Sequence, residues 1–176
     1  MQQWVTNFVR ANSVDRKLMD PAGTPAWFSL VPNVIGKPDM HQQNEGGKTG
    51  GLGAPDIAYA AGIFKLEPDE ALIVRLTIPK CQFANIALWN RYLQTFDYAQ
   101  RQISLNRRQM KNVTADGRVT VVLAPARPRG DAINWIDTEG RGGGNVFIRY
   151  VLPEGDMLQP ETRVVKLADL PAALEA

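Results

Sequence analysis

The chain has 176 residues, 44% of them hydrophobic, and its 20 basic and 18 acidic side chains leave a net charge of +2 at pH 7. This length predicts a single domain that can bury a hydrophobic core. The near balance of charges argues against nucleic acid or an anionic membrane surface as a partner. With one cysteine, Cys81, and one histidine, His41, an intrachain disulfide is excluded and a zinc site is disfavoured. We therefore expect no bound metal and no cofactor.

The first residues do not resemble a secretion signal, because a basic start followed by an apolar run is missing. No stretch of the sequence is long and apolar enough to cross a membrane. These two features predict a cytoplasmic protein that has no contact with a membrane.

The first third of the chain predicts little regular structure. Trp4, Val5, Phe8 and Val9 recur at helical spacing, so residues 2–12 are expected to form a short amphipathic helix. Residues 13–55 are rich in proline and glycine, and only 26–31 has the character of a strand. We expect residues 1–55 to form an N-terminal helix with a long arm or loop, separate from a domain at 56–176. A loop of this length also suggests the tail end of a longer protein.

The tripeptide Gly47-Lys48-Thr49 matches the end of a phosphate-binding P-loop. A P-loop needs a further glycine five residues earlier, where this chain has Gln42, and it must join a strand to a helix. The glycines and the proline that follow Thr49 disfavour a helix. We therefore interpret this stretch as a surface loop or a lid.

From residue 57 onward the sequence has the alternation of β-strands. Apolar residues recur with a period of two in 57–66, 71–78, 83–89, 118–124 and 145–152, and turn residues separate these segments. No strand–helix–strand rhythm occurs, so an antiparallel β-sandwich is favoured over a parallel sheet. The C-terminal region predicts a last strand at 164–167 and a short helix at 170–174, which would give the sandwich flanking helices at both termini.

Three stretches resemble a known bacterial family. They read FANIALWNRYLQTFDYAQRQISLNRRQ at 83–109, NWIDTEG at 134–140 and VFIRYVLPEG at 146–155. In the same order they resemble the motifs of the family called domain of unknown function 1214, over about residues 56–170. The resemblance implies a mainly β, jelly-roll-like sandwich at the C-terminal end of a longer protein. It implies no agreed reaction.

The same motifs contain the candidate site residues. Asp97 and Asp137 stand beside aromatic residues, as the acid and the base or nucleophile of a glycoside-cleaving site would. Aromatic rings with planar polar groups also suit a sugar-binding site, and the candidate ligand-binding residues are Asn90, Tyr98, Asn106, Gln109, Trp135 and Arg149. Alternatively, the Asp and Asn side chains cap turns, and Arg149 pairs with Asp97 or Asp137 to hold two loops together.

Three functions remain open from the sequence. The first is binding of a small polar or carbohydrate-like ligand by a non-catalytic domain. The second is a hydrolase of the glycoside type that uses Asp97 and Asp137. The third is an interaction or oligomerisation domain, which would form a homodimer or contact a missing N-terminal portion through the arm and the sheet edges.

Overall fold

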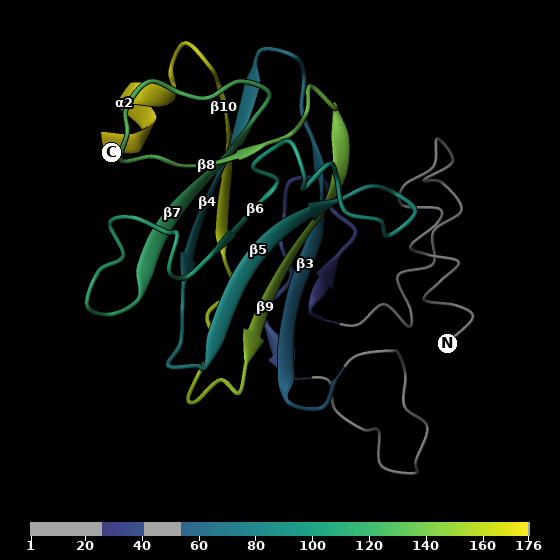
Figure 1. Cartoon of the computed structure of the whole chain (residues 1–176), viewed down its shortest axis with the longest axis vertical. Coiled ribbons are helices and arrows are strands. Elements are labelled where there is room, and N and C mark those ends of the chain that lie inside the picture. Colours follow the sequence, from purple (N-terminus) through teal and green to yellow (C-terminus); the bar gives the residue numbers. More distant parts are fainter. Residues whose placement is uncertain (1–25, 41–53, 176) are drawn as a thin grey trace.

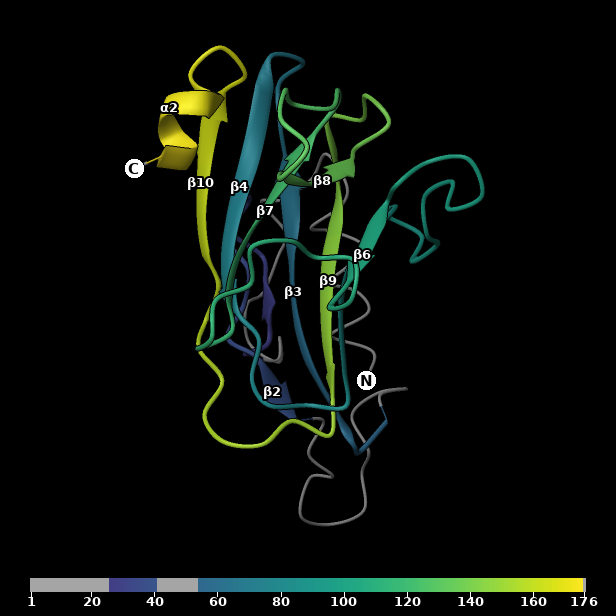
Figure 2. The ribbon, with the colours of Figure 1, turned by 60° about the vertical axis from the view of Figure 1, so that its left-hand side comes forward.

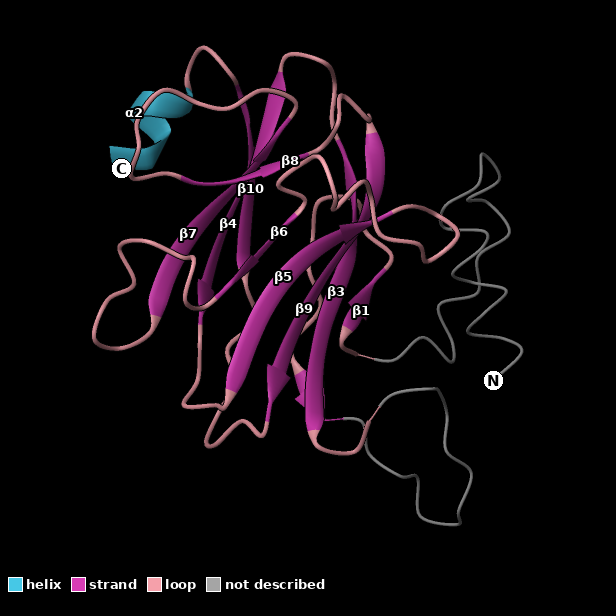
Figure 3. Ribbon diagram, viewed as in Figure 1, coloured by secondary structure: helices cyan, strands magenta, loops and turns pink. Residues whose placement is uncertain are grey.

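The structure is a computed structural model that describes residues 26–40 and 54–175. The elements in chain order are β1 (Phe28–Ser29), β2 (Asp39–Met40), β3 (Ile57–Lys65), β4 (Glu70–Thr77), β5 (Phe83–Trp89), β6 (Ser104–Asn106), β7 (Arg118–Ala124), β8 (Asn134–Asp137), β9 (Gly143–Val151), β10 (Glu161–Lys166) and α2 (Leu170–Glu175) (Figure 1). The chain is therefore mainly β, as the alternating pattern predicted (Figure 3).

The strands form two sheets. In the described part of the chain, the large sheet has the order β1-β3-β9-β5-β6, with β2 also paired to β3, and the small sheet has the order β10-β4-β7-β8. Figure 2 shows β10, β4 and β7 on one side of the molecule and β3, β9 and β6 on the other. Both sheets are mixed, because β1 runs parallel to β3 and β8 runs parallel to β7. The purely antiparallel arrangement expected from the sequence is therefore wrong at these two short pairings.

The hydrophobic core fills the space between the two sheets. Because side chains alternate along a strand, every second residue of each long strand points inward. The inward rows are Leu72, Val74 and Leu76 of β4, Ala84, Ile86 and Leu88 of β5, Val119, Val121 and Leu123 of β7, and Val146, Ile148 and Tyr150 of β9. A second apolar cluster lies on the outer side of the small sheet, where Leu170 and Ala173 of α2 pack against Ile73 and Val122.

One side of the sandwich is closed by a segment that precedes β2. Ile35 belongs to the core between the sheets and is 1% exposed. The backbone oxygen of Ile35 accepts a hydrogen bond from Gln159 Nε2 at 2.8 Å, and that of Asn33 accepts one from Thr162 Oγ1 at 2.6 Å. The Asn33 side chain also bonds both the backbone N–H and the backbone oxygen of Lys65, at 2.7 and 2.8 Å. The described part of the predicted arm, 26–40, is therefore built into the sandwich.

The predicted strands agree with the structure along most of the chain. The segments predicted at 57–66, 71–78, 83–89, 118–124 and 145–152 are β3, β4, β5, β7 and β9. The last strand begins three residues earlier than expected, and the predicted strand at 26–31 shrinks to β1. The short strands β6 and β8 were not predicted as strands. The predicted N-terminal helix and the Gly47-Lys48-Thr49 loop lie outside the described residues.

Among the described residues, no helix is long and apolar enough to span a membrane.

Replacing Gly62 of β3 by alanine should destabilise the fold. A Cβ atom at this position would lie 2.1 Å from the backbone oxygen of Val34, so the backbone of the closing segment would have to move. We expect a loss of about 3 kcal/mol in the free energy of unfolding, the upper part of the range for overpacking, measured by urea denaturation. At Gly143 the added Cβ would meet the Phe64 oxygen at 3.3 Å, so Gly143→Ala should cost clearly less. Equal losses in the two variants would contradict the close approach of Val34 to β3.

Candidate functional site

Asp137, one of the two candidate catalytic carboxylates, holds two loops together. Its side chain is 8% exposed, and its Oδ2 atom accepts a hydrogen bond from Nη1 of Arg101 at 2.9 Å. Its Oδ1 atom accepts the backbone N–H of Glu139 at 2.7 Å. The hydrogen bond to Asp137 raises the pKa of Arg101. A clamp between loops was anticipated from the sequence, but the arginine is Arg101 and not Arg149.

Asp97, the second candidate, is exposed and caps a turn in the loop after β5. Its Oδ1 atom accepts the backbone N–H groups of Ala99 and Gln100 at 3.1 and 3.2 Å. Its own backbone N–H donates to Oε1 of Glu139 at 2.6 Å, and Oε2 of Glu139 accepts Nε of Arg141 at 2.8 Å. Asp97 thus bonds to its own turn, and Asp137 bonds both Arg101 of the loop after β5 and the backbone of Glu139.

The candidate amide side chains also cap turns. Asn90 Oδ1 accepts the backbone N–H groups of Tyr92 and Gln94, at 2.8 and 3.1 Å. Asn106 Oδ1 accepts those of Arg108 and Gln109, at 3.0 and 3.2 Å. In the same turn, Oε1 of Gln109 accepts the backbone N–H of Asn106 at 2.9 Å. These side chains satisfy backbone groups that the sheet leaves unpaired, as Asn residues often do in turns.

The two candidate aromatic residues do not meet Arg149. Tyr98 is 76% exposed in the loop after β5. Trp135 of β8 packs with the outer cluster of the small sheet, and its Nε1 donates to the Ala124 oxygen at 3.0 Å. Arg149 is on the outer side of the large sheet, opposite the inward row of β9. The candidates therefore do not converge on one pocket: Asn106 shares a row of the large sheet with Arg149, and the others lie in loops or on the opposite sheet.

A different set of side chains gathers around Arg149. We call the outer surface of the large sheet formed by Tyr59, Asn85, Trp89, Phe147 and Arg149 the arginine face. Tyr59 of β3 and Asn85 of β5 are the register partners of Arg149 on its two sides. The guanidinium carbon of Arg149 lies 4.8 Å from the centre of the Trp89 ring and 5.8 Å from that of Phe147, and these two ring centres are 4.6 Å apart. Arg149 thus lies on an aromatic platform.

Polar atoms on this surface have no hydrogen-bond partner in the described part of the chain. They are Asn85 Oδ1, Trp89 Nε1 and, next to Trp89 in the ladder, Oδ1 of the fully buried Asn145. Arg149 itself makes no hydrogen bond or ion pair with a described residue. Burial lowers the pKa of Arg149, and Tyr59 acts in the opposite direction. Buried polar atoms are normally bonded, so the arginine face is chemically incomplete.

The sequence contains a signal for this surface, which the motif-based reasoning did not use. On β9 the inward apolar residues alternate with Asn145, Phe147 and Arg149. These three residues form a polar and aromatic row on the outer side of the sheet. On β5 the outer row contains Asn85 and Trp89. What the sequence does not reveal is that β5 and β9 are neighbours, because the paired positions are 56 or more residues apart.

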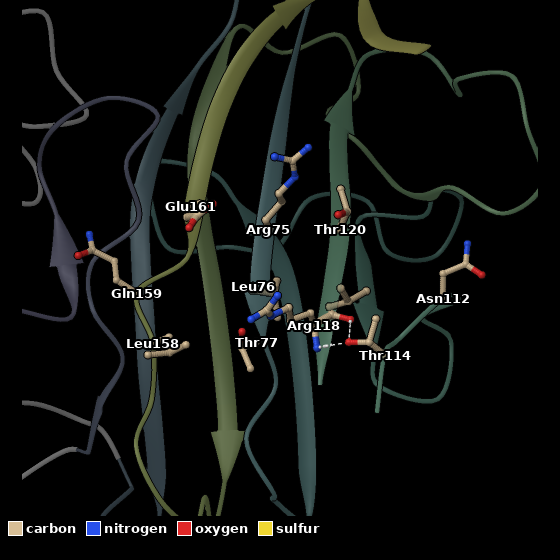
Figure 4. A pocket seen from close by; sticks show the side chains of 11 residues that line it. Arg75, Leu76, Thr77, Asn112, Thr114, Arg118, Thr120, Leu158, Gln159 and Glu161 are labelled. Carbon is tan, nitrogen blue, oxygen red and sulfur yellow. Dashed lines mark hydrogen bonds between the residues drawn. The ribbon is translucent and has the colours of Figure 1, made fainter. Parts of the chain in front are cut away.

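A groove of about 590 Å³ lies on the outer side of the small sheet (Figure 4). Arg75 and Arg118 line it with Thr77, Thr120 and Glu161. Both arginines have partners in the protein, since Arg75 Nη2 donates to the Ala173 oxygen at 3.3 Å and Arg118 Nε lies 3.1 Å from Asp116. The groove holds none of the candidate residues and no aromatic ring, so it is the weaker candidate site.

Within residues 26–40 and 54–175, no group of three or more His, Cys, Asp and Glu side chains is arranged to hold a metal ion. Cys81 packs against the core, and burial raises the pKa of its thiol.

Two solved structures resemble the chain. One is an uncharacterised protein from Burkholderia cenocepacia, with 34% identity, a TM-score of 0.65 and coverage of 78% of this chain and 36% of that chain. The other is the VPA0106 protein from Vibrio parahaemolyticus, with 20% identity, a TM-score of 0.51 and coverage of 70% of this chain and 34% of that chain. The second likeness shows the fold alone. The matched region spans about a third of each solved protein.

No protein-family model and no curated protein matches the chain.

Replacing Asp137 by alanine should destabilise the protein, because the Arg101 guanidinium and the Glu139 N–H lose their acceptor. We expect a loss of about 2 kcal/mol in the free energy of unfolding by urea denaturation, within the range for a hydrogen bond to a charged group. The matched control is Asp156→Ala at an exposed position, which should change stability by less than about 0.5 kcal/mol. An Asp137→Ala variant as stable as this control would contradict the clamp.

Proposed function

We propose that this domain binds a small polar, carbohydrate-like ligand on the arginine face, without catalysing its conversion. The observation that carries the proposal is the pair of unpartnered polar atoms Asn85 Oδ1 and Trp89 Nε1, on partly exposed side chains, beside an arginine that has no carboxylate partner among the described residues. The first is an acceptor and the second is a donor. Sugar hydroxyl groups both donate and accept hydrogen bonds, so a sugar can satisfy both kinds of atom.

The rings of the arginine face support the same ligand class. Trp89 and Phe147 lie within 4.6 Å of each other, with ring planes inclined by 31°. Binding sites for small molecules combine such apolar surfaces with a few polar groups that fix the orientation of the ligand. The face is also partly open, since Tyr59, Asn85, Trp89 and Arg149 all keep some exposure to solvent. The partly exposed Trp89 ring, packed against the buried Phe147, therefore offers an apolar contact for a sugar beside these polar groups.

The two other functions have weaker support. A hydrolase would need Asp97 and Asp137 as an acid and a base, and both already serve the loops. An interaction domain is supported by exposed apolar side chains such as Phe83 and Leu152, which are 46% and 51% exposed. Phe83 begins β5 and Leu152 directly follows β9, and neither side chain carries a polar group. Binding to a second copy or to another part of a longer protein is therefore tested as an alternative outcome below.

We also propose that the sandwich has jelly-roll topology and that the chain belongs to the family called domain of unknown function 1214. The large sheet supports the first point, because β9 returns between β3 and β5, as in a Greek key whose last strand lies beside its first. The ordered motifs at 83–109, 134–140 and 146–155 support the second. The solved proteins are about three times as long as the matched region, which supports a place in a longer chain.

At least one sugar in a panel of glucose, galactose, glucuronate and galacturonate should stabilise the purified chain. A ligand present at a hundred times its dissociation constant adds about 2.7 kcal/mol to the free energy of unfolding, which a thermal-shift assay detects as a higher Tm. Trp89→Ala should abolish the shift, because it removes both the ring and the unpartnered N–H. Trp89→Phe should weaken binding about tenfold, because it removes one hydrogen bond only.

Trp135→Phe is the matched control, since it makes the same change on the other sheet, where the indole N–H already has a partner. This variant should bind the sugar as the unchanged chain does. The proposal fails if no sugar stabilises the folded chain, or if Trp89→Ala still responds.

A further inference from the structure

The arginine face contains a positive charge that its own sheet does not balance. Arg101, Arg141 and Arg118 each pair with a carboxylate, at 2.9, 2.8 and 3.1 Å, and their side chains are 48%, 54% and 74% exposed. Arg149 is more enclosed, and it has no such partner among the described residues. The least hydrated of these four arginines is therefore the one without an anion.

No acidic side chain in the described part of the chain pairs with Arg149. Its row in the large sheet runs through Asp39, Tyr59, Arg149, Asn85 and Asn106. Asp39 lies beyond Tyr59 and forms no ion pair with Arg149. An arginine remains protonated in a protein, so Arg149 cannot escape the cost of burial by losing its proton. A ligand that brings an anion would offset this cost.

We infer that the ligand of the arginine face is a sugar acid, whose carboxylate pairs with Arg149 and whose hydroxyl groups bond the partly exposed Asn85 and Trp89. This inference rests on the proposed function and adds the charge of the ligand. The guanidinium group presents a planar fork of N–H donors that fits a carboxylate in a bidentate manner. The Trp89 ring holds that fork in place through the contact at 4.8 Å, so little side-chain freedom is lost on binding.

The test compares each neutral sugar with its acid. Dissociation constants for glucose and glucuronate, and for galactose and galacturonate, are measured at pH 7 and constant ionic strength by calorimetry on the unchanged chain. At least one acid should bind about tenfold or more tightly than its neutral partner, as expected for a charge-assisted bidentate pair. Acetate alone should bind far more weakly, because it offers no hydroxyl groups.

Variants of Arg149 identify the group responsible. Arg149→Met keeps the length and apolar contacts of the side chain and should reduce the affinity for the acid to that for the neutral sugar. Arg149→Lys keeps the charge without the fork and should retain part of the preference. Arg163→Met is the matched control, since Arg163 is an exposed arginine on the small sheet, and it should leave all affinities unchanged. Urea denaturation checks that Arg149→Met is folded, which we expect because it removes an unpaired, half-buried cation.

The outcomes separate this inference from the proposed function. If acids and neutral sugars bind equally and Trp89→Ala binds neither, the inferred pairing of a ligand carboxylate with Arg149 is wrong, while the proposed sugar site stands. Absence of binding by all four sugars would overturn both. A concentration-dependent dimer that is lost in Arg149→Met would show that the carboxylate comes from a second copy of the chain, which would also overturn the sugar acid.

Discussion

The double pairing of β9 determines both the core and the candidate site. β9 pairs with β3 from Val151 to Gly143 and with β5 from Val151 to Asn145, so its register is fixed on both sides. Its inward row fills the core, while Phe147 and Arg149 form the middle of the outer surface. Because the side-chain period of a strand is two, a slip by one residue would drive the arginine into the core. The register that seals the sandwich therefore also places the arginine face.

The polar side chains of the loops and those of the large sheet differ in their bonding. The polar residues of the loops after β5 and β8 bond one another and the backbone, with Asp137 and Glu139 as the shared acceptors. These bonds hold the two loops together. The arginine face lies on three long neighbouring strands, whose side chains are positioned by the ladder. A site on rigid strands needs little ordering when it binds, which favours affinity for a small molecule.

Sequence reasoning was most successful where a pattern is local. Alternation over seven to nine residues revealed β3, β4, β5, β7 and β9, but β6 and β8 have three and four residues, too few to show a period. Grouping polar residues by motif did not locate the site, because the side chains of Asn90, Asn106 and Asp97 cap turns next to them in the chain. Arg149 was a candidate ligand-binding residue, but its neighbours Tyr59 and Asn85 are 90 and 64 positions away and meet it only through strand pairing.

An unpartnered polar atom alone does not define a binding site. The hydroxyl group of Tyr150 also has no partner among the described residues, yet it lies in the core, where burial raises its pKa and a sugar has no access. The arginine face differs because two such atoms, on the partly exposed Asn85 and Trp89, occur together with a cation that has no ion pair among the described residues and with an aromatic platform. An apolar side chain in place of Arg149 would avoid the desolvation of a charge at no cost to the ladder. The half-buried charge, which the sandwich stabilises only through its contacts with the Trp89 and Phe147 rings, therefore supports the proposed role of Arg149 in binding an anion.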